Sequence, residues 1–240
     1  MWWLPFVAPG AELQMREPLF DLSAEYEHML NQGIRLSGED RHFFLEGRVR
    51  YLMGILPLHF QPKRILDFGC GIGDTTSHLA AMFTEAEVIG VDEAEKAVEH
   101  AREQFGCARV RFERVESLRN DYFDLAYVNR VFHHIPTGER IGAFNLIRRS
   151  LSSGGMLALF ENNPWNPGAR MVMKRIPFDR DAIMISPREA VQLVVESDFQ
   201  RSTLARSLFY FPHCLAWLRA TEVVLDRLLL GAQYCVLAQK

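Results

Sequence analysis

The sequence predicts an α/β protein: a doubly wound, mostly parallel sheet preceded by helices. Two observations support this class. Short apolar runs alternate with helical segments, and a glycine-rich turn follows the first run. Strands buried on both faces of a parallel sheet appear as such near-continuous apolar runs. The predicted strands cover residues 64–68, 87–92, 108–115, 122–129, 154–161, 202–211 and 232–239.

Apolar residues at helical spacing separate these runs. The first helical region, residues 20–56, is interrupted by the breaker Leu36-Ser37-Gly38. Ser186 as N-cap and Pro187 at the first helical position mark the start of a later helix. Helices are predicted over residues 74–83, 93–105, 137–151, 186–197 and 213–230.

Composition fits a soluble globular chain of one domain over residues 1–240. The chain is 48% hydrophobic and 24% charged, with a net charge of −3. This balance argues against a large phosphate-binding surface, so we expect no nucleic-acid partner. Within the domain we expect N-terminal helices (20–56), a central unit (63–161), a substrate-side loop (162–185) and the C-terminal part of the sheet (186–240).

The cysteines and the N-terminal residues indicate the cellular compartment of the protein. Cys70, Cys107, Cys214 and Cys235 form no Cys-x-x-Cys pair, which favours reduced thiols in a cytoplasmic protein. The apolar start MWWLPFVAPG lacks early Lys or Arg, is broken by two prolines and is too short to span a membrane. It packs against the domain, or it contacts a membrane or caps an apolar pocket. We expect no stable membrane insertion, and the oligomeric state stays open.

The segment LDFGCGIGD joins the first strand to its helix. Gly69, Gly71 and Gly73 permit a tight turn that brings a ligand close to a helix N-terminus. The dinucleotide pattern Gly-x-Gly-x-x-Gly fails because Asp74 takes the third glycine position. The carboxylate of Asp67 would repel a pyrophosphate, but it favours a ligand with an ammonium and a positively charged sulfur.

Asp92 ends the second predicted strand, where a doubly wound fold places an acid that accepts hydrogen bonds from ribose hydroxyls. Together with Asp67, it indicates a nucleoside ligand with a cationic tail and no phosphates. S-adenosylmethionine fits that description.

Four segments resemble, in order, the signature segments of class I S-adenosylmethionine-dependent methyltransferases. They are ILDFGCGIGDTTSHLA, VIGVDEAEKAVEHAR, FDLAYVNRVFHHIP and IRRSLSSGGMLALFE. The closest type is the small-molecule group that includes the ubiquinone and menaquinone biosynthesis enzymes. The resemblance covers about residues 20–161. It implies a seven-stranded sheet whose last strand runs antiparallel, with S-adenosylmethionine as the cofactor.

The resemblance also implies cofactor contacts. It places Asp67, Gly69 and Gly71 at the methionine moiety, Asp92 at the ribose, and Asn129 and Arg130 beside the sulfonium and methyl, with Cys70 and Glu93 as further candidates. Glu116 is the candidate for the adenine amino group, although the Gly-Asp usual after the third strand is absent.

Methyl transfer requires an aligned nucleophile and often removal of a proton. The catalytic candidates beyond the strand ends are His133, His134 and Glu161. His134 aligns with a family histidine that often has a structural role, so a base and a structural residue both stay open. Glu161 is either a base or an anchor for the following loop.

The stretch FENNPWNPGA superficially resembles the Asn-Pro-Pro-aromatic loop of nucleic-acid methyltransferases, but it follows the fifth strand, not the fourth, and lacks the second proline. We interpret it as the start of a substrate-covering loop, with Asn162 and Trp165 as acceptor-side candidates. Further along, Asp179 and Asp181 have no converging metal ligands nearby in the sequence. We expect no metal, and acids that pair with Arg175 or Arg180.

The leading interpretation is an enzyme that methylates an oxygen, carbon or nitrogen of a small, apolar organic acceptor. The alternative is a catalytically silent S-adenosylmethionine-binding regulator or complex subunit. Turnover with an acceptor would separate the two.

Overall fold

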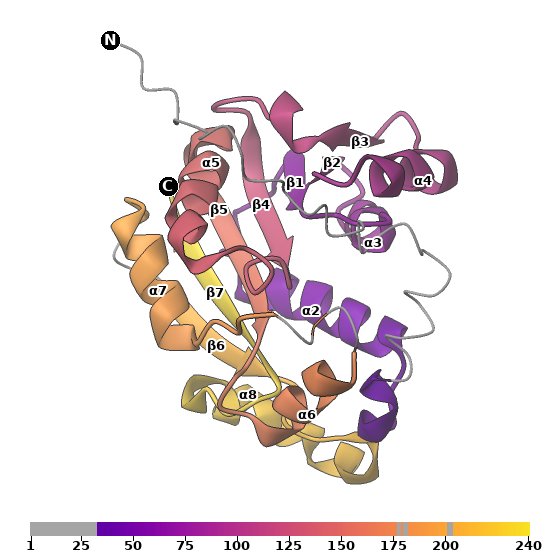
Figure 1. Ribbon diagram of the computed structural model, residues 1–240, viewed down its shortest axis with the longest axis vertical. Helices are drawn as coiled ribbons and strands as arrows, with labels where there is room; N and C mark the ends of the chain where they lie inside the picture. The colour runs from indigo at the N-terminus through magenta and orange to yellow at the C-terminus, as the bar shows by residue number, and fades with distance from the viewer. Residues whose placement is uncertain (1–32, 177–178, 180–181, 201–203) are drawn as a thin grey trace, which may run out of the picture.

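The computed structural model describes residues 33–176, 179, 182–200 and 204–240. They form one seven-stranded sheet in the order β3-β2-β1-β4-β5-β7-β6 (Figure 1). β7 runs antiparallel to both β5 and β6, and the other neighbours in the sheet are parallel. The predicted fold class is confirmed. The strands are β1 (Arg64–Phe68), β2 (Glu87–Asp92), β3 (Val110–Arg114), β4 (Phe123–Asn129), β5 (Leu151–Asn162), β6 (Leu204–Leu208) and β7 (Gln233–Gln239).

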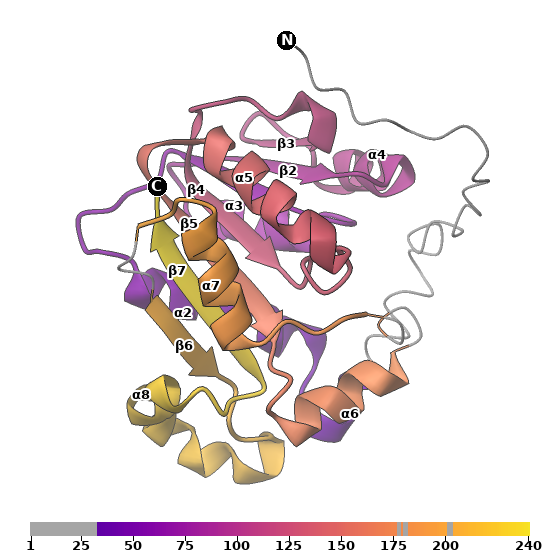
Figure 2. The same cartoon turned by 60° about the vertical axis from the view of Figure 1, so that its left-hand side comes forward.

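Helices cover both faces of the sheet (Figures 1 and 2). One face packs against α2 (Arg41–Ile55), α3 (Asp74–Met82) and α4 (Glu95–Phe105). The other packs against α5 (Arg140–Ser150) and α7 (Pro187–Glu196). Shorter elements are η1 (Arg35–Ser37), η2 (Val115–Ser117), η3 (Thr137–Glu139), α6 (Pro167–Arg175), η5 (His213–Thr221), α8 (Glu222–Leu225) and η6 (Asp226–Leu228).

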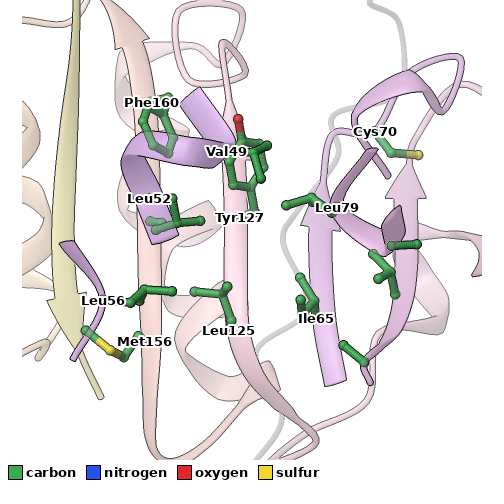
Figure 3. Close-up of a cluster of buried hydrophobic side chains, with 14 of the residues drawn as sticks. Val49, Leu52, Leu56, Ile65, Cys70, Leu79, Leu125, Tyr127, Met156 and Phe160 are labelled. Carbon is green, nitrogen blue, oxygen red and sulfur yellow. The ribbon is translucent and has the colours of Figure 1, made fainter. Parts of the chain in front are cut away.

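Helix α2 is held against the sheet by its apolar side. Asp40 caps its first turn by accepting from the Phe43 N–H at 2.8 Å. Val49 and Leu52 are fully buried and lie over Tyr127 and Phe160, as Figure 3 shows. Burying one such aliphatic side chain contributes about 1.5–3 kcal/mol. Figure 3 shows Leu56, just after α2, beside Met156 in β5, and Val49 beside Tyr127 near the end of β4, so α2 runs along these strands with its first turn toward their carboxyl ends.

Two predicted elements need correction. Residues 213–230 do not form one helix: Leu215 leaves helical geometry, with φ −114° and ψ 21°, and the segment divides into η5, α8 and η6. The predicted loop over 162–185 contains helix α6, because the Asn166 side chain caps the Ala169 N–H at 2.9 Å and Pro167 occupies the first turn.

Strand boundaries also shift. β6 ends at Leu208 because Phe209 adopts a left-handed conformation, with φ 62°. β5 begins at Leu151, which pairs with Phe123 on β4, so the preceding helix ends one residue before the predicted limit. The predicted helix over residues 20–32 and the apolar start of the chain lie outside the described residues. Among the helices of the described part, none has the length and hydropathy needed to cross a bilayer.

Candidate cofactor site and acceptor cavity

The predicted site residues converge at the carboxyl edge of the parallel strands. Phe68 at the end of β1 pairs with Val91 on β2 and with Val128 on β4, and Asn129 pairs with Phe160 on β5. The glycine loop, Asp92, Asn129 and the end of β5 therefore share one edge. In open α/β sheets this edge is where ligands bind.

The glycine loop approaches its neighbours closely. Gly69, Gly71 and Gly73 all have positive φ, at 75°, 52° and 93°. The Gly69 N–H donates to the Val91 carbonyl at 2.8 Å. A Cβ on Gly69 would lie 2.3 Å from Val131 Cγ2, so the loop cannot accept a side chain there without displacing the segment after β4.

Asp92 organises the loop and still has capacity for a ligand. Its Oδ2 accepts from the Gly71 N–H at 2.8 Å, and its Oδ1 accepts from the Ala94 N–H at 2.9 Å. Each carboxylate oxygen can accept a second hydrogen bond, so two ribose hydroxyls remain possible donors. Glu93 beside it is exposed, and Glu116 is exposed with its carboxylate 3.1 Å from Arg114.

Asp67 is a buried carboxylate with few donors. It is 1% exposed and accepts one side-chain hydrogen bond, from Thr76 Oγ1 at 2.7 Å. Burial raises the pKa of Asp67 to about 7, with Thr76 opposing the shift and Asp92 adding to it. Nearby, the buried Oδ1 of Asn129 has no hydrogen-bond partner among the described residues. A cationic donor fits both groups, and the ammonium of S-adenosylmethionine supplies one. Cys70 contributes only a neutral thiol, because burial raises its pKa.

A buried ion cluster lies beside this edge. His133 Nδ1 is 2.6 Å from Glu161 Oε2, and Glu161 Oε1 accepts from the Phe132 N–H at 2.8 Å. On the other side, His133 Nε2 is 3.4 Å from Asp179 Oδ1. Burial lowers the pKa of His133, but Glu161 and Asp179 raise it by more, to about 9. His133 therefore carries a positive charge between two carboxylates, and Glu161 anchors the segment after β4.

His134 belongs to the same cluster but reaches solvent. Its side chain is 32% exposed, and its Nε2 lies 3.4 Å from Asp179 Oδ1. Sequence reasoning expected Asp179 to pair with Arg175 or Arg180. Among the described residues, its partners within ion-pair distance are His133 and His134. His133 and Asp179 are 46 residues apart in the sequence, so no local sequence pattern could predict their contact.

An apolar cavity of about 410 Å³ adjoins the cofactor edge. Aromatic and aliphatic walls come from α2, α6 and the turn after β6, including Phe43, Phe44, Phe209, Met171, Val172 and Ile176. Arg48, Arg130 and Asn162 also line the cavity, and Arg48 acts electrostatically on Asp67. The cavity therefore borders the predicted cofactor edge.

Trp165 is placed outside this cavity lining. Its side chain is 42% exposed, and the Arg188 guanidinium lies 5.6 Å from its ring. Its neighbours Asn166 and Pro167 contribute to the wall instead. The signal for α6 was present in the sequence as an Asn-Pro step, which is a helix N-cap followed by proline at the first helical position.

Comparison with known proteins finds methyltransferases that are similar to part of this chain. A methyltransferase-domain family model matches residues 65–155. A trans-aconitate 2-methyltransferase of Variovorax paradoxus is 31% identical over 110 residues, 45% of this chain and 41% of that protein. A malonyl-[acyl-carrier protein] O-methyltransferase of Legionella pneumophila is 33% identical over 82 residues, 32% of this chain and 28% of that protein. The chain thus spans less than half the length of the curated relatives it matches.

Solved structures share the fold. A S-adenosylmethionine-dependent methyltransferase from Archaeoglobus fulgidus superposes with a TM-score of 0.61 at 16% identity, covering 86% of this chain and 97% of that one. Human N-acetylserotonin methyltransferase in complex with S-adenosylmethionine superposes with a TM-score of 0.63 at 14% identity, covering 93% of this chain and 59% of that one. These structures show the fold, and the family-model match and the sequence relatives show that the central part of the chain is similar to methyltransferase domains.

Proposed function

We propose that this chain transfers the methyl group of S-adenosylmethionine to a small organic acceptor held in the apolar cavity. The observation that carries the proposal is the buried Asp67 on β1, with the unpaired Asn129 Oδ1 at the end of the neighbouring β4, next to a glycine loop organised by Asp92. Both groups favour a cationic donor and disfavour a phosphate. When bound, S-adenosylmethionine supplies an already activated methyl carbon.

The chain's own residues position that group. Asp67 and Asn129 hold the ammonium, with the loop of Gly69, Cys70 and Gly71 alongside the methionine moiety. Asp92 accepts the ribose hydroxyls, with Glu93 beside it, and Glu116 is our candidate for the adenine amino group. Arg130 follows Asn129 and lies at the boundary between the cofactor edge and the acceptor cavity.

Within the ion cluster we assign different roles to the two histidines. His133 is buried and bonded on both sides, so we propose that it orders the cluster with Glu161. His134 is part-exposed and has a carboxylate beside it, an arrangement suited to a general base. We propose that His134 accepts a proton from the acceptor when the nucleophile carries one.

The acceptor is a small molecule. The cavity walls are largely apolar, which favours an acceptor with an apolar part. The named relatives methylate trans-aconitate and a malonyl-carrier substrate, so small-molecule methylation is also the activity named for those proteins. We propose no nucleic-acid partner, because the net charge of −3 gives no overall attraction to polyanions.

Domain organisation and location complete the proposal. We propose that residues 1–240 act as one methyltransferase domain, since the described strands all belong to one sheet. The four free cysteines fit a cytoplasmic protein with reduced thiols.

The test is turnover of S-adenosylmethionine with a panel of small acceptors, followed by mass spectrometry of the product. The proposal expects an acceptor-dependent gain of one methyl group and formation of S-adenosylhomocysteine. Tight cofactor binding without methylation of any acceptor in the panel would favour the catalytically silent alternative.

A further inference from the structure

Part of the lining of the acceptor cavity presents hydrogen-bond donors. A chain of three side chains fixes this orientation. Arg48, which has only donors, directs Nη1 at Gln233 Oε1 at 3.2 Å. Gln233 must therefore turn its amide nitrogen the other way, and Nε2 donates to Asn162 Oδ1 at 3.0 Å.

The chain ends with a free donor in the cavity. Because Asn162 presents its oxygen to Gln233, its amide NH₂ is left over, and it has no hydrogen-bond partner among the described residues. Asn162 is only 9% exposed, so this donor is available mainly to an occupant of the cavity that it lines.

A second donor lies on the neighbouring strand end. Arg130 lines the same cavity, and its backbone N–H donates to the Phe160 carbonyl at 2.8 Å, which ties it to β5. Its Nε is buried and unpaired within the described part of the chain. Asp179 acts on Arg130 electrostatically, but no carboxylate of the described residues lies within ion-pair distance of Arg130. A buried N–H of a charged guanidinium that lacks a hydrogen-bond acceptor costs free energy, so a ligand that accepts from it is favoured.

Two other charged residues of the lining, Glu39 and Arg41, have partners of opposite charge, and Arg48 donates to Gln233. Glu39 is 2.6 Å from Arg219 and 2.9 Å from His213, and Arg41 is 3.0 Å from Asp74. The lining groups that lack a full partner, the Arg130 guanidinium and the Asn162 amide, are therefore hydrogen-bond donors, and much of the remaining lining is apolar.

We propose that the acceptor is an amphipathic carboxylate, whose carboxylate binds Arg130 and the Asn162 amide while its apolar body fills the cavity. A guanidinium and an amide NH₂ together satisfy the acceptor oxygens of a carboxylate. This inference rests on the proposed function only for calling the occupant an acceptor. The expectation that the cavity binds an apolar anion depends only on the residues that line it.

The experiment compares octanoate with octanamide, an uncharged compound of nearly the same shape. Both are titrated calorimetrically into the full chain, with and without S-adenosylhomocysteine. Octanoate should bind at least tenfold more tightly than octanamide. Asn162→Asp keeps the acceptor for Gln233 but replaces the free donor with a negative charge, and Arg130→Gln removes the cation. Each should abolish the preference for octanoate. Arg170→Gln, exposed on α6 outside the cavity lining, should retain it.

Equal binding of the two probes, no binding of either, or a preference that survives in both variants would overturn the proposal. Circular dichroism and S-adenosylhomocysteine affinity show whether each variant is folded. If octanoate is preferred but S-adenosylhomocysteine does not bind, this inference stands and the proposed methyl transfer fails.

Discussion

Lowering the pH should weaken cofactor binding through Asp67. Burial raises the pKa of this carboxyl to about 7, so in the free protein it is protonated below that pH. The ammonium of S-adenosylmethionine favours the ionised form, so binding below pH 7 must release a proton. Affinity therefore falls as pH falls, by up to tenfold for each unit below 7.

The magnitude follows from the same pKa. Between pH 7.5 and pH 5.5 the protonated fraction of Asp67 in the free protein rises from about a quarter to nearly all. One released proton then weakens affinity roughly 25-fold, or about 2 kcal/mol. His133 does not contribute over this range, because its pKa of about 9 keeps it charged throughout. The ligand's own amine, with a pKa of about 7.7–8.0, stays mostly protonated over this range.

Calorimetric titration at four pH values between 5.5 and 7.5, in buffers of different ionisation enthalpy, measures both affinity and proton release. Asp67→Asn is the control: it should bind more weakly at pH 7.5 and show no pH dependence. An affinity that is constant over the range, or a pH dependence that persists in Asp67→Asn, would refute the assignment of Asp67 to the ammonium.

Three other substitutions and one pH series test the rest of the site. Gly69→Ala should abolish cofactor binding or displace the segment at Val131, and unchanged affinity in calorimetry would contradict the close packing of the loop. Glu161→Gln removes one partner of a buried charged cluster and should destabilise the fold by about 3–5 kcal/mol in urea unfolding, whereas a loss below 1 kcal/mol would show that His133 is not charged. In the natural chain, the stability from His133 is fully present below its unfolded pKa of about 6.5 and is lost as pH rises through about 9, so unfolding free energies that do not decline over this range would disagree with the cluster. Trp165→Ala should leave cofactor affinity and turnover within about threefold, because the ring lies outside the cavity lining; a large loss of turnover would return Trp165 to the acceptor wall.

Local chemistry made much of the cofactor edge predictable. The glycines with positive φ, the buried acid at the end of β1 and the acid at the end of β2 all lie within one strand–helix–strand unit. Their spacing along the chain is therefore enough to place them together, because parallel strands end at the same edge. The antiparallel position of β7 came from the family resemblance.

The acceptor side of the site was harder to predict from the sequence, because segments far apart in the chain form it. Arg48 and Gln233 are 185 residues apart, and Gln233 and Asn162 are 71 residues apart. The periodicity of apolar residues along the sequence does not indicate such long-range contacts. Residues 213–230 were also mispredicted: their apolar residues suggested one packed helix, whereas Trp217 in η5 and Val223 in α8 are 76% and 80% exposed.

We propose that the edge between β1 and β2 binds S-adenosylmethionine through Asp92. Equilibrium titration of S-adenosylhomocysteine into the natural chain, Asp92→Ala and Glu99→Ala tests it most directly. Glu99 is exposed on α4 and serves as the matched control. We expect one site per chain and no change of affinity in Glu99→Ala. The affinity of Asp92→Ala should fall more than about tenfold, since each hydrogen bond to a charged acceptor contributes roughly 1.5–3 kcal/mol. Equal affinity in all three proteins would show that Asp92 does not hold the cofactor.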